Sequence, residues 1–190
     1  SDHKVRYARS NPGLGEVHPA RDASVTYHEY GHHVQWSLCN TYDSAGNTVD
    51  NNEASGLGEG FADVFANSIT GKSNVFEVWA ATAPGVQRDA SKAVPPDFEY
   101  CKLTPCIYNS GGTAISCHDT GRVFSGLCWE LKAKVFNGDA SWLMRRIVWA
   151  LRDSPGPHTF RRICLAMLSD QILMNDDPRF MSMYDIMVKR

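Results

Sequence analysis

The string His-Glu-Tyr-Gly-His at residues 28–32 constrains this chain more than any other feature of its sequence. It lies in a segment whose apolar residues recur at helical spacing and which Asp22 can cap. On an α-helix His28 and His32 lie one turn apart on the same face, so two imidazole nitrogens can reach one Zn²⁺. Glu29 is rotated by about 100° around that helix, which places it to hold a metal-bound water rather than to ligate the ion.

A second string, Gly-Glu-Gly-Phe-Ala-Asp at residues 58–63, lies downstream in another helical pattern. Glu59 and Asp63 are four residues apart, so both carboxylates share one helix face. Glu59 can complete a His₂Glu ligand set that leaves a fourth metal position open. Asp63 can accept the other ring N–H of a ligand histidine and so fix its tautomer. The glycines on either side of Glu59 allow two helices to approach closely.

Composition excludes several other classes of protein. The chain has 190 residues, of which 43% are hydrophobic and 11% aromatic, which is too apolar for a disordered segment. A formal net charge of −2 argues against a nucleic-acid surface or a polybasic membrane binder. No apolar run is long enough to span a bilayer. We therefore expect a globular protein with neither a nucleic-acid nor a membrane partner.

Helical periodicity dominates the chain, and strand patterns are scarce. The expected helices cover about residues 22–39, 53–70, 74–82, 119–135, a stretch containing 143–151, 158–174, and a last segment from 177 to 186. The fold class predicted from this pattern is α+β, mainly α. The tryptophans lie among aliphatic residues and are expected in the core or at a subdomain interface; they are Trp36, Trp79, Trp129, Trp142 and Trp149.

The chain has six cysteines, and no two of them form a C-x-x-C pair. An even number in a chain of this size favours disulfide bonds and an oxidising compartment, so we expect a secreted, extracellular protein. Cys101, Cys106 and Cys117 lie in a stretch rich in proline and glycine that such bonds could staple. The alternative is a set of buried free thiols.

Together these strings resemble the gluzincin metallopeptidases, of which thermolysin is the best-known type. The segment E-A-S-G-L-G-E-G-F-A-D at residues 53–63 is closer to the fungalysin branch, which has E-x-G-G-M-G-E-G-W-x-D there. A third string, C-H-D-T-G-R-V-F at residues 117–124, is similar to the H-x-x-G-x-V-W of fungalysins. The three matching patches cover roughly residues 22–135, in the family's order and approximate separation.

The resemblance implies a zinc-dependent endopeptidase with one catalytic Zn²⁺, held by His28, His32 and Glu59, and with Glu29 as general base. It implies a zincin-like fold that forms a single catalytic domain over residues 1–190. Residues 1–40 would supply the N-terminal segment with the active-site helix, and residues 41–190 a mainly helical subdomain carrying the Glu ligand. Residues 1–21 are too short for the twisted β-sheet that precedes this helix in the family, so we expect that sheet to be reduced or missing.

Several side chains have competing interpretations. His118 matches a family histidine that donates a hydrogen bond to the developing oxyanion, and the alternative is a local polar role at a helix N-terminus. Tyr42 falls between the two zinc strings and could be a second donor, although no motif fixes it there. The loop at residues 43–53 has enough oxygen ligands for Ca²⁺ but lacks EF-hand spacing, so turn and cap chemistry is favoured over a calcium site.

The expected substrate is a protein or peptide, cleaved by a metal-activated water. Three alternatives to an endopeptidase remain. A zinc-binding pseudoenzyme or binding domain would use the metal structurally, although such a site needs no base at Glu29. A helical interaction domain would carry the His-Glu-x-x-His string by accident. An aminopeptidase would need an acidic motif to hold a substrate α-amine, and none is obvious.

Overall fold

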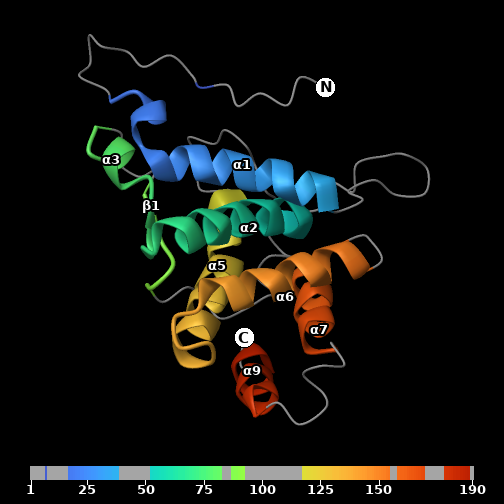
Figure 1. Cartoon of the computed structure of the whole chain (residues 1–190). Coiled ribbons are helices and arrows are strands. Elements are labelled where there is room, and N and C mark those ends of the chain that lie inside the picture. Colours follow the sequence, from blue (N-terminus) through green and yellow to red (C-terminus); the bar gives the residue numbers. More distant parts are fainter. Residues whose placement is uncertain are drawn as a thin grey trace, which may run out of the picture.

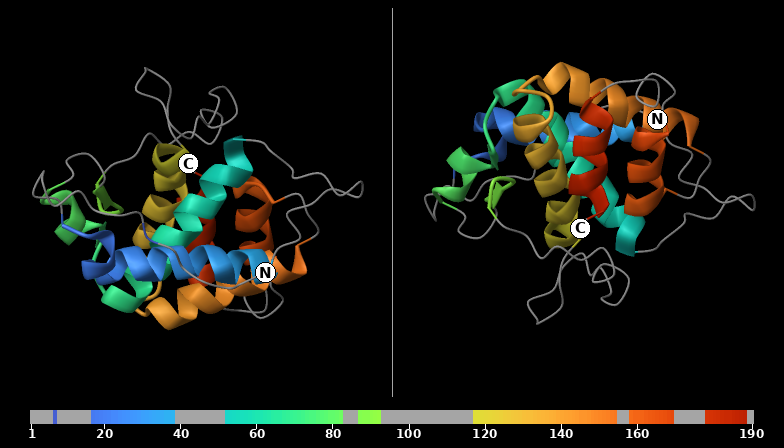
Figure 2. Two further views of the ribbon diagram at one scale, coloured as in Figure 1. Left: turned by 90° about the horizontal axis from the view of Figure 1, so that it is seen from above. Right: turned by 90° about the horizontal axis from the view of Figure 1, so that it is seen from below.

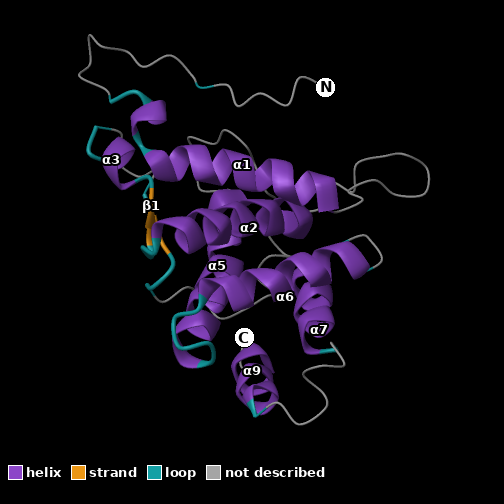
Figure 3. Ribbon diagram, viewed as in Figure 1, coloured by secondary structure: helices purple, strands orange, loops and turns teal. Residues whose placement is uncertain are grey.

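The computed structural model describes residues 7, 17–38, 52–82, 87–92, 117–154, 158–169 and 178–188. Helices dominate these residues (Figures 1 and 3): α1 Ala23–Leu38, α2 Asn52–Thr70, α3 Glu77–Ala80, α5 Cys117–Lys134, α6 Ala140–Asp153, α7 Phe160–Leu168 and α9 Arg179–Val188, with a 3₁₀ turn, η2, at Pro19–Arg21. Two short strands, β1 Asn74–Val75 and β2 Arg88–Asp89, pair antiparallel. The mainly helical α+β fold class is confirmed. None of the described helices combines the length and apolarity that crossing a membrane requires.

Helix α2 packs between α1 and α5 (Figure 2), and glycines set both contacts. A Cβ on Gly31 of α1 would lie 2.8 Å from the Cα of Ala62 on α2. A Cβ on Gly121 of α5 would lie 2.6 Å from the backbone nitrogen of Gly60. Neither distance is compatible with a side chain, so the backbones of α1 and α5 approach α2 closely. A Cβ on Gly121 would also lie 2.8 Å from the Cβ of Glu59, so the contact with α5 is formed beside this residue.

Two apolar clusters stabilise this arrangement. The larger one joins α2, α5, α6, α7 and α9, and its fully buried residues include Phe61, Phe124, Leu127, Leu131, Ile147, Phe160, Ile163 and Met167. The smaller one lies at the N-terminal end of α1 and consists of Val25, Ala66, Val75 and Phe76. Cys128 and Cys164 belong to the larger cluster as buried thiols. Burial of this much apolar surface is the main force that holds α2 in place.

The segment at residues 74–82 differs from the helix expected there. Residues 74 and 75 form β1, and the helix is limited to the single turn of α3. Phe76 interrupts the pattern because its backbone is left-handed, with φ 65° and ψ 27°. The register of the two-stranded sheet pairs Val75 with Arg88. That pairing brings the cationic side chain of Arg88 to Asp63 of α2 and close to His28 of α1.

Asp22 fixes the start of α1, as its position before the helical pattern predicts. Its Oδ1 accepts hydrogen bonds from the backbone N–H and the hydroxyl of Ser24, at 3.0 and 2.6 Å. Its Oδ2 accepts from the backbone N–H groups of Val78 and Trp79, at 2.8 and 3.0 Å. One carboxylate therefore caps both α1 and α3 and ties the two helices together.

Replacing Asp22 by asparagine is expected to destabilise the protein by about 1–3 kcal/mol at pH 7, because an amide offers one acceptor oxygen in place of two. Burial opposes ionisation, but the hydrogen bonds from Ser24, Trp79 and Val78 still lower the pKa of Asp22. A lowered pKa stabilises the fold above the unfolded-state value of about 3.9, and this contribution is lost as the pH falls through the folded-state pKa. Urea unfolding of both proteins at several pH values should show a constant difference above pH 5 that shrinks in more acidic buffer. A difference that does not change with pH would contradict the ionised cap.

Candidate metal centre

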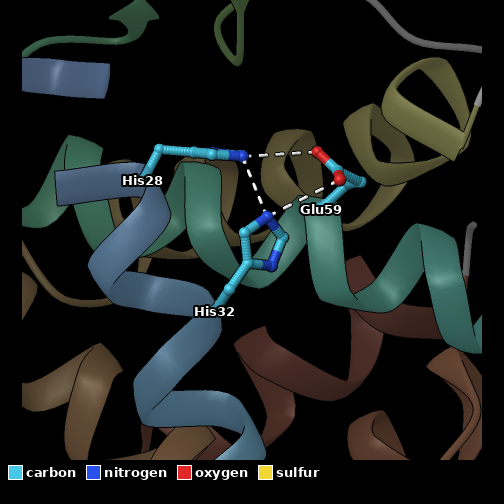
Figure 4. Close-up of side chains that lie close together, drawn as sticks. All are labelled: His28, His32 and Glu59. Atoms are coloured by element: carbon cyan, nitrogen blue, oxygen red, sulfur yellow. Dashed lines mark hydrogen bonds and ion pairs between the residues drawn. The ribbon is translucent and has the colours of Figure 1, made fainter. Parts of the chain in front are cut away.

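Three side chains from the two helices α1 and α2 converge on one another (Figure 4). The Nε2 atoms of His28 and His32, both on α1, are 3.1 Å apart. Glu59 on α2 places Oε2 3.3 Å from Nε2 of His28 and Oε1 3.6 Å from Nε2 of His32. The side chains of His28 and Glu59 are 3% and 6% exposed, and that of His32 is 17% exposed. His32 therefore marks the more open side of the cluster.

The geometry of this cluster fits a tetrahedral zinc ion. With metal–ligand distances of about 2.0–2.1 Å, the edges of a tetrahedron measure about 3.3–3.4 Å. The three separations in the cluster, 3.1, 3.3 and 3.6 Å, lie close to that value. Two imidazoles and one carboxylate are also the donor set of many catalytic zinc sites, with the fourth position left open.

At this site a metal ligand must be a neutral imidazole or an ionised carboxylate, and the surroundings favour these states for His32 and Glu59. Burial and the neighbouring His28 lower the pKa of His32 to about 4, so its imidazole is neutral at pH 7. Burial disfavours the Glu59 carboxylate, but the surrounding histidines lower its pKa to about 2. His28 behaves differently: burial lowers its pKa, and the hydrogen bonds to Asp63 and Glu59 outweigh that effect and raise it. A cation bound here would displace the His28 proton that faces the cluster.

Asp63 contacts the ring nitrogen of His28 that does not face Glu59 and His32. Its Oδ1 is 2.9 Å from Nδ1 of His28. This contact favours the tautomer with a proton on Nδ1, which leaves the Nε2 lone pair directed at the cluster. Burial opposes ionisation of Asp63, yet the charge of Arg88 and the hydrogen bond from His28 hold its pKa well below the usual range.

Arg88 is a residue of the site that the sequence pattern did not indicate. Its guanidinium donates to both carboxylate oxygens of Asp63, from Nε at 2.8 Å and from Nη2 at 2.6 Å. The same Nη2 atom is 3.6 Å from Oε2 of Glu59, and Arg88 is 8% exposed. A buried, bidentate pair of this kind orients the carboxylate strongly. No motif spacing connects residue 88 to the two zinc strings, so only a general rule, that a buried arginine needs a carboxylate partner, could have suggested it.

His118 stands at the beginning of α5, with Nε2 3.4 Å from Oε2 of Glu59. Its side chain is 44% exposed, so it borders the cluster from the solvent side. Burial is the main cause that lowers the pKa of His118, and the positive charges of Arg88 and His28 act in the same direction. The imidazole is therefore mostly neutral at pH 7 and can donate one N–H.

The remaining residues that the sequence indicates for the site are Glu29 and a group that the structure does not describe. Glu29 follows His28 on α1 and is half-buried, outside the three-residue cluster. Tyr42, the loop at residues 43–51, Cys101 and Cys106 lie outside the described residues, as does the side chain of Cys117. Cys39 also lies outside the described residues. Cys128 and Cys164 are buried thiols, as the alternative to disulfide bonds expects for these two. Disulfide bonds among the other four cysteines, the second oxyanion donor at Tyr42, and turn and cap chemistry in place of a calcium site stay predictions.

Two histidines one turn apart on a helix, together with a carboxylate from a second helix, could hold a metal ion and are typical of the metallopeptidase class. The sequence model of the fungalysin metallopeptidase family (M36) matches residues 16–188, and the chain belongs to this family. The family implies zinc as the metal and peptides as the substrate class. Searches against curated proteins and solved structures give no match.

Proposed function

We propose that the protein is a zinc-dependent endopeptidase, in which His28, His32 and Glu59 hold one Zn²⁺ and Glu29 is the general base. The observation that carries this proposal is the convergence of two imidazoles and one carboxylate at separations of 3.1–3.6 Å. Membership of a metallopeptidase family supports it. Zinc in such a site supplies a water of lowered pKa and polarises the carbonyl group to be attacked.

The remaining chemistry falls to side chains of this chain. Glu29 accepts the proton of the attacking water and afterwards delivers it to the departing amine. His118 donates its N–H to the oxyanion that develops on the peptide carbonyl, a role that its exposed position beside Glu59 supports. Asp63 and Arg88 act one step further away, because they hold the imidazole of His28 in the tautomer that a ligand needs.

Removal of the metal tests this function. The parent protein is expected to contain one zinc per chain and to cleave casein, to lose both properties after dialysis against a chelator, and to regain them when zinc is returned. Zinc without any proteolysis would favour a pseudoenzyme or binding domain, and absence of stoichiometric zinc would favour a helical interaction domain. Trimming from the N-terminus of an unblocked peptide, with a blocked peptide left intact, would indicate an aminopeptidase.

We further propose that the protein acts outside the cytoplasm. The typical secretion of fungalysin peptidases supports this location, and disulfide bonds among the four cysteines other than Cys128 and Cys164 would add to this support. Mass mapping of the purified protein with and without reductant would test the disulfides on which the cysteine argument depends.

A further inference from the structure

Phe76 stands out among the residues near the metal centre. It is 4% exposed, between β1 and α3, and belongs to the smaller apolar cluster. Its left-handed backbone, with φ 65°, is rarely adopted by a bulky residue without compensation from its surroundings. The compensation is specific: the Phe76 N–H donates to the Ser24 hydroxyl at 2.7 Å, and that hydroxyl donates in turn to Asp22. The N-terminus of α1 thus anchors the backbone from which the Phe76 ring projects.

The ring contacts two residues of the site. The rings of Phe76 and His28 are edge to face, with centroids 5.0 Å apart and planes at 75°. The guanidinium carbon of Arg88 lies 4.6 Å from the centroid of the Phe76 ring. His28 and Arg88 also both contact Asp63. Phe76 therefore packs against the first and last residues of the chain Arg88–Asp63–His28, which ends at the proposed metal position.

We propose that Phe76 is a positioning residue for the metal centre. Its ring limits the rotation of the His28 imidazole and holds the Arg88 guanidinium flat beside it, so that the Arg88–Asp63–His28 chain is already assembled before a metal binds. The attraction between a cation and an aromatic face, together with the exclusion of water from a buried ion pair, supplies the physical basis. This inference rests on the proposed zinc site and adds to it a residue that contacts neither metal nor substrate.

The test replaces Phe76 by leucine, which keeps apolar volume and removes the flat ring. We expect the dissociation constant for zinc, measured by chelator competition on the full metal-free chain, to rise about 10–100-fold, the range typical for partners behind a metal ligand. The visible spectrum of the Co²⁺-loaded variant should also differ from that of the parent, because the orientation of a ligand imidazole has changed. Neither readout depends on proteolysis.

Phe136→Leu is the matched control. Phe136 is also 4% exposed and also stacks on an aromatic residue, Trp142, but it belongs to the larger cluster. This variant should lose a similar amount of thermal stability and keep the zinc affinity and Co²⁺ spectrum of the parent. Equal zinc affinities for Phe76→Leu and Phe136→Leu would overturn the inference.

A second variant covers the case in which Phe76→Leu fails to fold. Ser24→Ala keeps the ring and removes the hydroxyl that anchors the Phe76 backbone. Its zinc dissociation constant should rise by at least about 3-fold, less than the about 10–100-fold of a residue directly behind a ligand, because the ring itself remains. An unchanged affinity and spectrum would again contradict the inference. If the parent itself binds no zinc, the proposed function fails; if the parent binds zinc and the variants bind it equally well, only the role of Phe76 fails.

Discussion

The Glu29→Gln protein is expected to bind zinc as the parent does and to lose peptidase activity by about 10²–10⁴-fold, because a carboxamide cannot accept the proton of the attacking water. Glu29 lies next to His28 on α1 but outside the cluster of three ligand-type side chains. The metal should therefore remain while the base is lost. The measurement combines zinc analysis of the purified variant with kcat/KM on a peptide substrate.

Glu77→Gln serves as its control, since Glu77 is on α3 and half-exposed, and pairs with Lys72 on the surface at 2.8 Å. That variant should keep both zinc and activity. A metal-loaded Glu29→Gln protein that cleaves at the parent rate would show that another group removes the proton, and the assignment of the base would be wrong.

The Glu59→Ala protein is expected to lose zinc as well as activity. One of the three proposed ligands disappears, and the loss of affinity should exceed the about 10–100-fold that is typical for a residue behind a ligand. Chelator competition measures this affinity directly, and circular dichroism of the metal-free protein establishes that the helices remain. Activity that returns only at high zinc concentration would agree with a weakened site.

Glu130→Ala is the matched control for Glu59→Ala. Glu130 lies on the neighbouring helix α5 and pairs with Lys134 at 2.7 Å on the surface, away from the cluster. Its removal should leave zinc affinity unchanged. Retention of parent affinity by Glu59→Ala would exclude Glu59 as a ligand, whatever the activity of the variant.

Local sequence signals predicted the framework of the site well. Asp22 marks the start of α1, and the helix expected over residues 53–70 ends where α2 ends, at Thr70, before Gly71 with its φ of 72°. A helix cap or a residue with positive φ depends on only a few neighbouring residues, so the local sequence can predict it. The spacing within each string is local in the same sense, but Glu59 lies 31 positions from His28. That these residues meet was expected from the resemblance of both strings to one family, and the structure brings His28, His32 and Glu59 together.

Features that depend on distant contacts could not be predicted in this way. The helix expected over residues 74–82 is replaced by a strand and a single turn, because Ser24 and Asp22 hold the backbone N–H groups of Phe76, Val78 and Trp79. Arg88 reaches Asp63 only through the pairing of β1 with β2. The contact of Ser24 with Phe76 joins residues 52 positions apart, and that of Arg88 with Asp63 joins residues 25 positions apart. Neither contact leaves a repeating pattern in the sequence.

Trp36 is a further correction. From the sequence, Trp36 is expected in the core or at a subdomain interface, but on α1 it is 61% exposed. Its ring stacks on that of His32, with the two centroids 6.1 Å apart. Helical spacing identifies which residues share a face of a helix, but it does not tell which neighbour, if any, covers that face.

The most direct test is a crystal structure of the protein as purified, with anomalous scattering recorded on both sides of the zinc absorption edge. We predict one strong zinc peak at about 2.0–2.2 Å from Nε2 of His28, Nε2 of His32 and a carboxylate oxygen of Glu59, with one coordination position left for water. A Glu59 carboxylate turned away from both imidazoles, with no zinc peak between them, would contradict the proposed metal centre and the peptidase mechanism built on it.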